Sequence, residues 1–201
     1  MMLLPKVDMS IFETLLARRS VRQYKAREVG QDVVHSLLEA AVHAPTAVHQ
    51  EPWGFVVIQD KKQLKHLSDT AKPLFVSAIE LRTLHTGHEM ENFGQDEFNI
   101  FYNAGTLILI CGTADAPFVE ADCWLAAENL ILAACAMGLG SCVIGSALLA
   151  LNMADIKHAL GVPSGYSVVA PIIIGYPDDK ISPVTRKRPL IFKSPSLATH
   201  T

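Results

Sequence analysis

The sequence predicts one α+β domain in which a central sheet is flanked by helices. Half of the 201 residues are hydrophobic, which is enough for a substantial core, and no internal repeat or linker divides the chain. Short apolar runs rich in β-forming residues alternate with segments in which apolar residues recur at helical spacing. The domain is expected to cover residues 1–201, with its core at about 10–177 and an extended tail at 178–201.

Two helices are expected at the start of the chain. Ser10 and Glu13 form the S-x-x-E pattern of a capping box, and this helix is expected to end near residues 18–20. Asp32 is predicted to cap a second helix, and Pro45 marks its end. The apolar face of the first helix is predicted to comprise Ile11, Phe12, Leu15 and Leu16.

A strand and two helices are expected next. The run 53–60 is short, apolar and rich in β-formers, so it is predicted to be a strand. A short helix at 61–67 and a separate helix that begins near Pro73 are expected to follow. The segment 83–99 is polar, and we interpret it as a surface excursion or lid.

The second half of the chain is more apolar than the first. The continuous apolar run 106–112 predicts a fully buried strand, and 119–137 predicts a long apolar helix. A short strand at 141–145, a helix at 152–160 and a last main strand at 166–174 complete the expected core. The chain beyond these elements is rich in Pro, Lys and Arg without periodicity, which is typical of an extended tail that lies on another surface.

Composition limits the classes of function. A formal net charge of −3 gives no general case for binding nucleic acid. No run of about 18 apolar residues predicts a membrane span, and the N-terminus lacks the pattern of a signal peptide. The four cysteines have no C-x-x-C spacing, so we interpret them as reduced thiols of a cytoplasmic protein: Cys111, Cys123, Cys135 and Cys142.

An arginine cluster stands out against this acidic background. Arg18, Arg19, Ser20 and Arg22 lie where the first helix is expected to give way to extended chain. Guanidinium groups together with a hydroxyl are the donors that a phosphate requires. Arginine near a helix C-terminus also complements the helix dipole, so a purely structural role is equally consistent with this stretch alone.

A second basic cluster lies in the predicted tail. Arg186 and Arg188 alternate, so an extended backbone would direct both side chains to the same side. A basic tail is usually only solvated, but two clusters with the same guanidinium spacing could converge on one anion. The residues themselves therefore support a plausible phosphate site without proving that the clusters meet.

Five motifs in a fixed order resemble those of a known family. Over residues 10–189 the chain is similar to the FMN-dependent nitroreductase family. No single motif is specific, but the ordered set is. The motifs are RRSVRQY at 18–24, APTAVHQEPW at 44–53, AACAMGLGSCVIG at 133–145, GYP at 175–177 and RKRP at 186–189.

This resemblance implies a nitroreductase-like α+β fold with a central, mostly antiparallel sheet flanked by helices, and an intertwined homodimer. It implies FMN at the dimer interface, with NAD(P)H as hydride donor and a small electron-poor acceptor, such as a nitroaromatic or quinone, in a ping-pong cycle. No catalytic side chain is expected, because the flavin N5 atom exchanges the hydride. Neither nucleic acid nor a membrane is expected as a partner.

The resemblance also assigns candidate site residues. Arg18, Arg19 and Ser20, with Arg186 and Arg188, would hold the FMN phosphate. Arg22 would reach the pyrimidine edge of the flavin, where reduction places negative charge. The remaining contacts would come from Pro45, Thr46, Ala47 and His49 of the other subunit and from the backbone of Ile144 and Gly145.

Two residues depart from the family pattern near the flavin ring. The usual run is close to P-S-A-x-N-x-Q-P-W, whereas here His49 replaces the Asn and Glu51 replaces the Gln. Histidine can still donate a hydrogen bond, but a carboxylate cannot unless it is protonated. These two departures from the family pattern therefore predict different contacts at the ring edge and, with them, a different redox potential. Aromatic residues near the predicted lid could stack on acceptors: Phe93, Phe98, Phe101 and Tyr102.

Several alternatives remain open at this stage. The glycines at 138, 140 and 145 suggest a dinucleotide fingerprint, but a helix precedes them and their spacing is wrong. His85, His88 and neighbouring glutamates could bind a metal, although histidines on a polar loop are usually solvated, and no metal is expected. The same scaffold could also serve dehalogenation, other flavin chemistry or redox sensing, and a flavin-free protein with a basic patch is a third class.

Overall fold

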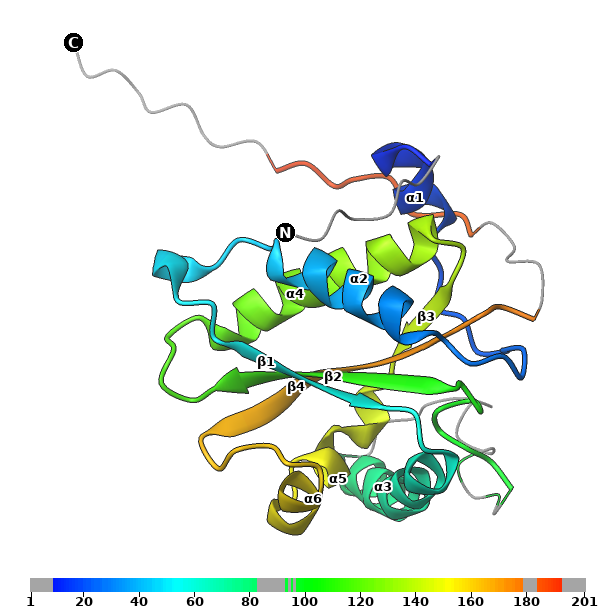
Figure 1. Ribbon diagram of the computed structural model, residues 1–201, viewed down its shortest axis with the longest axis vertical. Coiled ribbons are helices and arrows are strands. Elements are labelled where there is room, and N and C mark those ends of the chain that lie inside the picture. The colour runs from blue at the N-terminus through cyan, green and yellow to red at the C-terminus, as the bar shows by residue number, and fades with distance from the viewer. Residues whose placement is uncertain (1–8, 83–92, 94, 96, 179–183, 193–201) are drawn as a thin grey trace.

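One antiparallel sheet forms the centre of the protein (Figure 1). The computed structural model describes residues 9–82, 93, 95, 97–178 and 184–192. The strand order is β1-β2-β4-β3, and all three strand pairs are antiparallel. The predicted α+β class with a central antiparallel sheet is thereby confirmed. The strands are β1 (Trp53–Ile58), β2 (Thr106–Thr113), β3 (Gly140–Val143) and β4 (Tyr166–Gly175).

Helices cover both faces of this sheet (Figure 1). One face carries α2 (Gln31–Val42) and α4 (Val119–Ala136). The other carries α3 (Lys61–Arg82), α5 (Leu148–Leu151) and α6 (Ala154–Ala159). Alternate residues of β2 belong to the two cores, with Ile108 and Ile110 on the α2/α4 side and Leu107 and Leu109 on the other, all fully buried. Because β2 is buried on both faces, its sequence is continuously apolar rather than alternating.

The first two helices begin differently from each other. Helix α1 (Ile11–Ala17) has the predicted capping box, since Glu13 N–H donates to Ser10 Oγ at 3.3 Å and Ser10 N–H donates to the Glu13 carboxylate at 2.7 Å. The prediction for Asp32 was wrong, because Gly30 is the N-cap of α2 and Asp32 lies in the first helical turn. A carboxylate in that turn still favours the helix, because it interacts with the positive end of the helix dipole.

Helix α3 runs unbroken from Lys61 to Arg82, with Pro73 inside it. The prediction of two separate helices was therefore wrong. Before the proline, a buried face that includes Leu64, Leu67 and Ala71 packs against the core. Beyond it, the ring of Phe75 packs on that of Phe93, with the ring centres 5.0 Å apart. Tertiary packing of this kind overrides the local preference of a single proline. Most of the predicted lid at 83–99 lies outside the described residues.

The predicted helix at 152–160 is found as α6, which is a little shorter than predicted, and the short helix α5 before it was not predicted. Helix α5 ends at Leu151, and α6 begins at Ala154. The Asn152 side chain accepts from Val168 N–H and donates to Val168 C=O, both at 2.9 Å. This two-point contact connects the end of α5 to β4.

Three of the four cysteines are buried, and all four are free thiols, as predicted. Burial raises the pKa of Cys111 to about 11 and that of Cys123 to about 12, so both remain neutral thiols at physiological pH. Within the described part of the chain, we find no helix that is both long and apolar enough to span a membrane.

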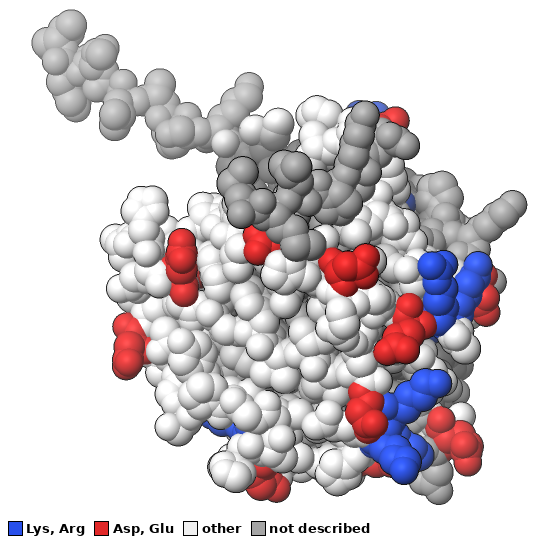
Figure 2. All heavy atoms as spheres, in the orientation of Figure 1, with Lys and Arg blue, Asp and Glu red and all other residues white. Residues whose placement is uncertain are grey.

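Several large apolar side chains are left uncovered. Helix α1 buries only Thr14, whereas its predicted apolar face is exposed, with 75% of Phe12 and 76% of Leu16 accessible. Lys and Arg gather along one edge of the face in Figure 2, and much of the rest of that face is uncharged. Further exposed apolar residues are Phe118 and Leu125 near α4 and, in the tail, Leu190, Ile191 and Phe192.

Candidate functional site

The arginine segment lies against the open edge of the sheet. Ser20 forms a parallel bridge with Ser141 of β3, and Val21 N–H donates to Ser141 C=O at 2.9 Å. Tyr24 then pairs with Pro177, beyond the end of β4. Arg18 and Arg19 precede this contact and are half-buried. The chain therefore places Arg18, Arg19, Ser20 and Arg22 together beside β3.

Close packing of Val21 on Gly140 fixes this arrangement. A Cβ added to Gly140 would lie 2.8 Å from Cβ, Cγ1 and Cγ2 of Val21, which is closer than van der Waals contact allows. We expect Gly140→Ala to lower the free energy of unfolding by about 1–3 kcal/mol, measured by chemical denaturation. Gly165→Ala is the control, since a Cβ there meets nothing within 4 Å. Equal unfolding free energies for the two variants would contradict this packing.

The Arg22 side chain lies between an aromatic ring and a thiol. Its Cζ atom is 5.8 Å from the centre of the Tyr102 ring, and its positive charge acts on the Cys142 thiol. Burial raises the pKa of the Cys142 thiol despite the opposing effect of Arg22 and Ser20. The ion pairs found among the described residues involve neither Arg18 nor Arg22. Arg22 is therefore a positive charge beside two neutral groups, the Tyr102 ring and the Cys142 thiol.

A row of aromatic rings leads from helix α3 to Arg22. The ring centres of Phe75, Phe93, Phe98 and Tyr102 follow one another at 5.0, 5.2 and 5.6 Å. Tyr102 has a left-handed backbone with φ of 51°. Of the aromatic residues predicted to stack on acceptors, Phe101 is instead completely buried in the core. The other three are partly buried around one another, next to the candidate site.

Ile144 and Gly145 directly follow β3, so the fold brings them to the same edge as the arginine segment. Ile144 is buried, and its N–H donates to Pro171 C=O at 2.9 Å. Gly145 begins the 3₁₀ helix η3 (Gly145–Ala147), and open space surrounds its Cα atom in the single chain. A flat ligand can therefore approach the backbone at this point.

Residues 45–49 lie at the opposite corner of the sheet. They precede β1, which is the edge strand farthest from β3, and they include the 3₁₀ helix η1 (Ala47–His49) (Figure 1). Within one chain, Pro45, Thr46, Ala47 and His49 are therefore separate from the arginine segment. This separation agrees with the expectation that they act in a site formed by the other subunit.

The loop around η1 has an unusual backbone. Val48, His49 and Glu51 have φ values of 48°, 56° and 46°, in the left-handed region that side chains with a Cβ atom disfavour. The Ala47 N–H donates to Oδ1 of Asp122 in α4 at 3.1 Å. The sequence analysis did not identify Asp122, although an acidic residue in a helix as apolar as α4 was a visible signal.

Arg186 and Arg188 are exposed on extended chain. The structure shows neither a hydrogen bond nor an ion pair between these two residues and any other described residue. Guanidinium groups that share an anion need not contact one another, so the convergence of the two basic clusters stays a prediction. The two histidines of the metal hypothesis lie outside the described residues, and no group of metal-binding side chains is found elsewhere in the described part.

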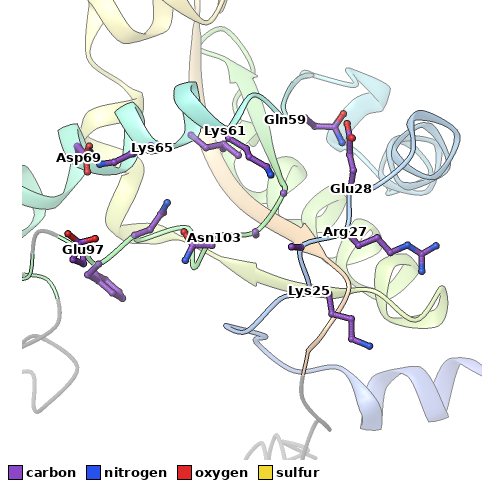
Figure 3. Close-up of a pocket in the computed structure, with 15 residues that line it drawn as sticks. Lys25, Arg27, Glu28, Gln59, Lys61, Lys65, Asp69, Glu97 and Asn103 are labelled. Atoms are coloured by element: carbon purple, nitrogen blue, oxygen red, sulfur yellow. Dashed lines mark hydrogen bonds and ion pairs between the residues drawn. The ribbon is translucent and has the colours of Figure 1, made fainter.

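A separate pocket of about 700 Å³ lies between the start of α3 and the loop that precedes β2. Its charged side chains are exposed and of mixed sign, and Lys65 pairs with Asp69 at 2.6 Å (Figure 3). Arg27 points away from the other labelled residues and lies over the Tyr176 ring at 3.8 Å. None of the residues predicted to bind FMN lines this pocket, although Phe98 does, so we do not assign the chemistry to it.

Comparison with known proteins identifies the family. The model of the nitroreductase family matches residues 15–176, so the chain belongs to that family. A relative from Archaeoglobus fulgidus, provisionally named NADH dehydrogenase/NAD(P)H nitroreductase, is 29% identical over 171 residues, which are 83% of this chain and 84% of the relative. An iodotyrosine deiodinase from Thermotoga neapolitana is 24% identical over 173 residues, covering 84% and 89% of the two chains.

The fold is shared with solved members of the family. The crystal structure of a Bacteroides fragilis nitroreductase with bound FMN aligns with a TM-score of 0.78 and 26% identity. The alignment covers 93% of this chain and all of that one. The recognition of the family from its ordered motifs is therefore confirmed.

Proposed function

We propose that this protein is an FMN-dependent oxidoreductase that takes hydride from NAD(P)H and reduces a small electron-poor acceptor such as a nitroaromatic or quinone. The observation with most weight is the arginine segment, which is packed on the sheet edge beside the open backbone at Gly145. Family membership and the FMN bound by a relative of the same fold give independent support.

The described residues fit the FMN that the family implies. Arg18, Arg19 and Ser20 supply cationic and hydroxyl donors at one end of the site, as a phosphate requires. Arg186 and Arg188 would add to them once the extended tail is placed against a partner. When bound, FMN would supply a hydride acceptor and donor at N5.

Arg22 would set the electrostatics of the site. Its charge lies beside the Tyr102 ring and the Cys142 thiol, and no carboxylate among the described residues forms an ion pair with it. A fixed cation beside the pyrimidine edge stabilises the negative charge that reduction places there. Gly145 would face the ring edge through its backbone, whereas the N–H and C=O groups of Ile144 already bond to Pro171 and Ala147.

A homodimer completes this proposal. The uncovered side chains of α1, α4 and the tail are too numerous and too apolar for a typical solvated surface. A second copy of the chain would cover them and would also bring Pro45, Thr46, Ala47 and His49 to the arginine segment of its partner. The site would then be incomplete in either chain alone.

Turnover tests the proposed reaction. Protein reconstituted with FMN should oxidise NADH or NADPH steadily when a quinone is added, and protein stripped of flavin should not. A protein that binds FMN but gives no turnover with either nucleotide and a panel of quinones and nitroaromatics would contradict the oxidoreductase assignment while leaving the flavin site intact.

Reductive dehalogenation is the second candidate, because an iodotyrosine deiodinase is among the relatives. Release of iodide from iodotyrosine by the dithionite-reduced, FMN-loaded protein would favour this function. Quinone turnover without iodide release would favour the first.

A further inference from the structure

We propose that Asp122 is a positioning residue that fixes the strained loop 46–51 in the shape needed to line the flavin. This inference rests on the proposed function, since the loop matters for FMN only if FMN binds. No motif of the family resemblance includes Asp122. It lies within the first turns of α4, outside both arginine clusters.

The carboxylate of Asp122 is buried. Only 3% of Asp122 is exposed, and its Oδ2 atom is buried without a hydrogen-bond partner among the described residues. A buried charged group costs stability unless it is compensated. The one described partner is the Ala47 N–H on Oδ1, at 3.1 Å. The helix dipole offsets part of this cost, because Asp122 lies in the first turn of α4, and the Ala47 N–H offsets a further part.

Asp122 accepts a hydrogen bond from the first residue of η1. The N-terminal N–H groups of a helix need acceptors, and the residue before the helix usually provides one. Thr46 makes no such cap, because its Oγ1 accepts instead from Glu51 N–H at 3.4 Å. Asp122 supplies the missing acceptor from a distant helix. The carboxylate therefore acts as the cap that the loop itself lacks.

The backbone of the loop 46–51 is strained. Left-handed φ values at Val48, His49 and Glu51 are each unfavourable, so the loop needs external contacts to keep this conformation. The Thr46 contact lies within the loop, whereas the Asp122 contact ties it to α4. Loss of the hydrogen bond to Asp122 should therefore let the loop leave the conformation that faces the partner's flavin.

Hydrogen exchange and FMN affinity together test this role. We expect Asp122→Ala to speed amide exchange in the peptide that covers residues 44–52, in flavin-free protein, and to weaken FMN binding roughly tenfold. Asp122→Asn keeps a carbonyl oxygen that can accept from Ala47, so it should restore most of the protection and affinity. Glu120→Ala is the matched control, since it removes an exposed carboxylate from the same turn of α4.

The outcomes separate this inference from the proposed function. If Asp122→Ala and Asp122→Asn both remain folded and show wild-type exchange at 44–52 with unchanged FMN affinity, the inference is wrong. Equal losses of protection and FMN affinity in Glu120→Ala and Asp122→Ala would also overturn it. The losses would then come from removing any carboxylate from the first turn of α4. If the wild-type protein binds no FMN, the proposed function fails, and the exchange experiment still reports on the tie.

Discussion

A double substitution of Phe12→Asp and Leu16→Asp is expected to convert the protein from a dimer into a monomer that does not retain FMN. Both side chains are about three-quarters exposed in the single chain, at 75% and 76%. In a dimer they would be buried, so two aspartates there would place unpaired charges in an apolar interface. Size-exclusion chromatography with light scattering measures the mass, and the absorbance of the eluted protein reports the flavin.

Leu149→Asp is the matched control for this experiment. Leu149 is also an exposed leucine, but it lies on α5, on the face of the sheet opposite α4 (Figure 1). The control should remain dimeric and yellow. A Phe12/Leu16 variant that is still a dimer with bound flavin would show that α1 does not contribute to the interface.

Substitution of Arg18 or Arg188 by Ala is expected to weaken FMN binding by roughly 10- to 100-fold, which corresponds to about 1.5–3 kcal/mol for one charge-assisted hydrogen bond. Arg18 lies beside the sheet edge, and Arg188 lies in the tail, so a loss of affinity in both variants would indicate that both clusters contribute to FMN binding. Titration of flavin-free protein with FMN, followed by quenching of flavin fluorescence, measures the affinity.

Lys187→Ala controls for general charge in this titration. Lys187 lies between the two tail arginines, and on extended chain its side chain points to the opposite side. Its loss should change FMN affinity little. If Arg18→Ala and Arg188→Ala bind FMN as tightly as the parent protein, the phosphate site lies elsewhere in the molecule.

The sequence predicted the strands of the sheet well because each is a short apolar run, although β1 is only partly buried. The continuous apolar run of β2 indicated a strand covered on both faces, and the capping box at Ser10 is a local contact that needs no tertiary information. The wrong predictions concern helices whose ends depend on contacts with distant parts of the chain. Helix α3 continues through Pro73 because it is packed on the rest of the fold. Helix α5 was missed because its contact with the sheet depends on the hydrogen bonds of Asn152 to Val168.

The candidate site was predictable in its residue types but not in its geometry. Local sequence cannot show that Ser20 meets Ser141, because the contact joins segments that lie far apart along the chain. It also cannot show that Asp122 caps a loop 75 residues earlier. Positions carried over from the family motifs were needed to connect the arginines with residues 45–49, which lie at the opposite corner of the same chain.

The most direct test of this account is the visible absorption spectrum of the purified protein, followed by identification of the chromophore that heating releases. We predict flavin bands and free FMN at about one molecule per chain, because each arginine segment would hold one phosphate. A colourless protein that also takes up no added FMN would contradict the central claim, and the arginine segment would then be only the basic end of a helix.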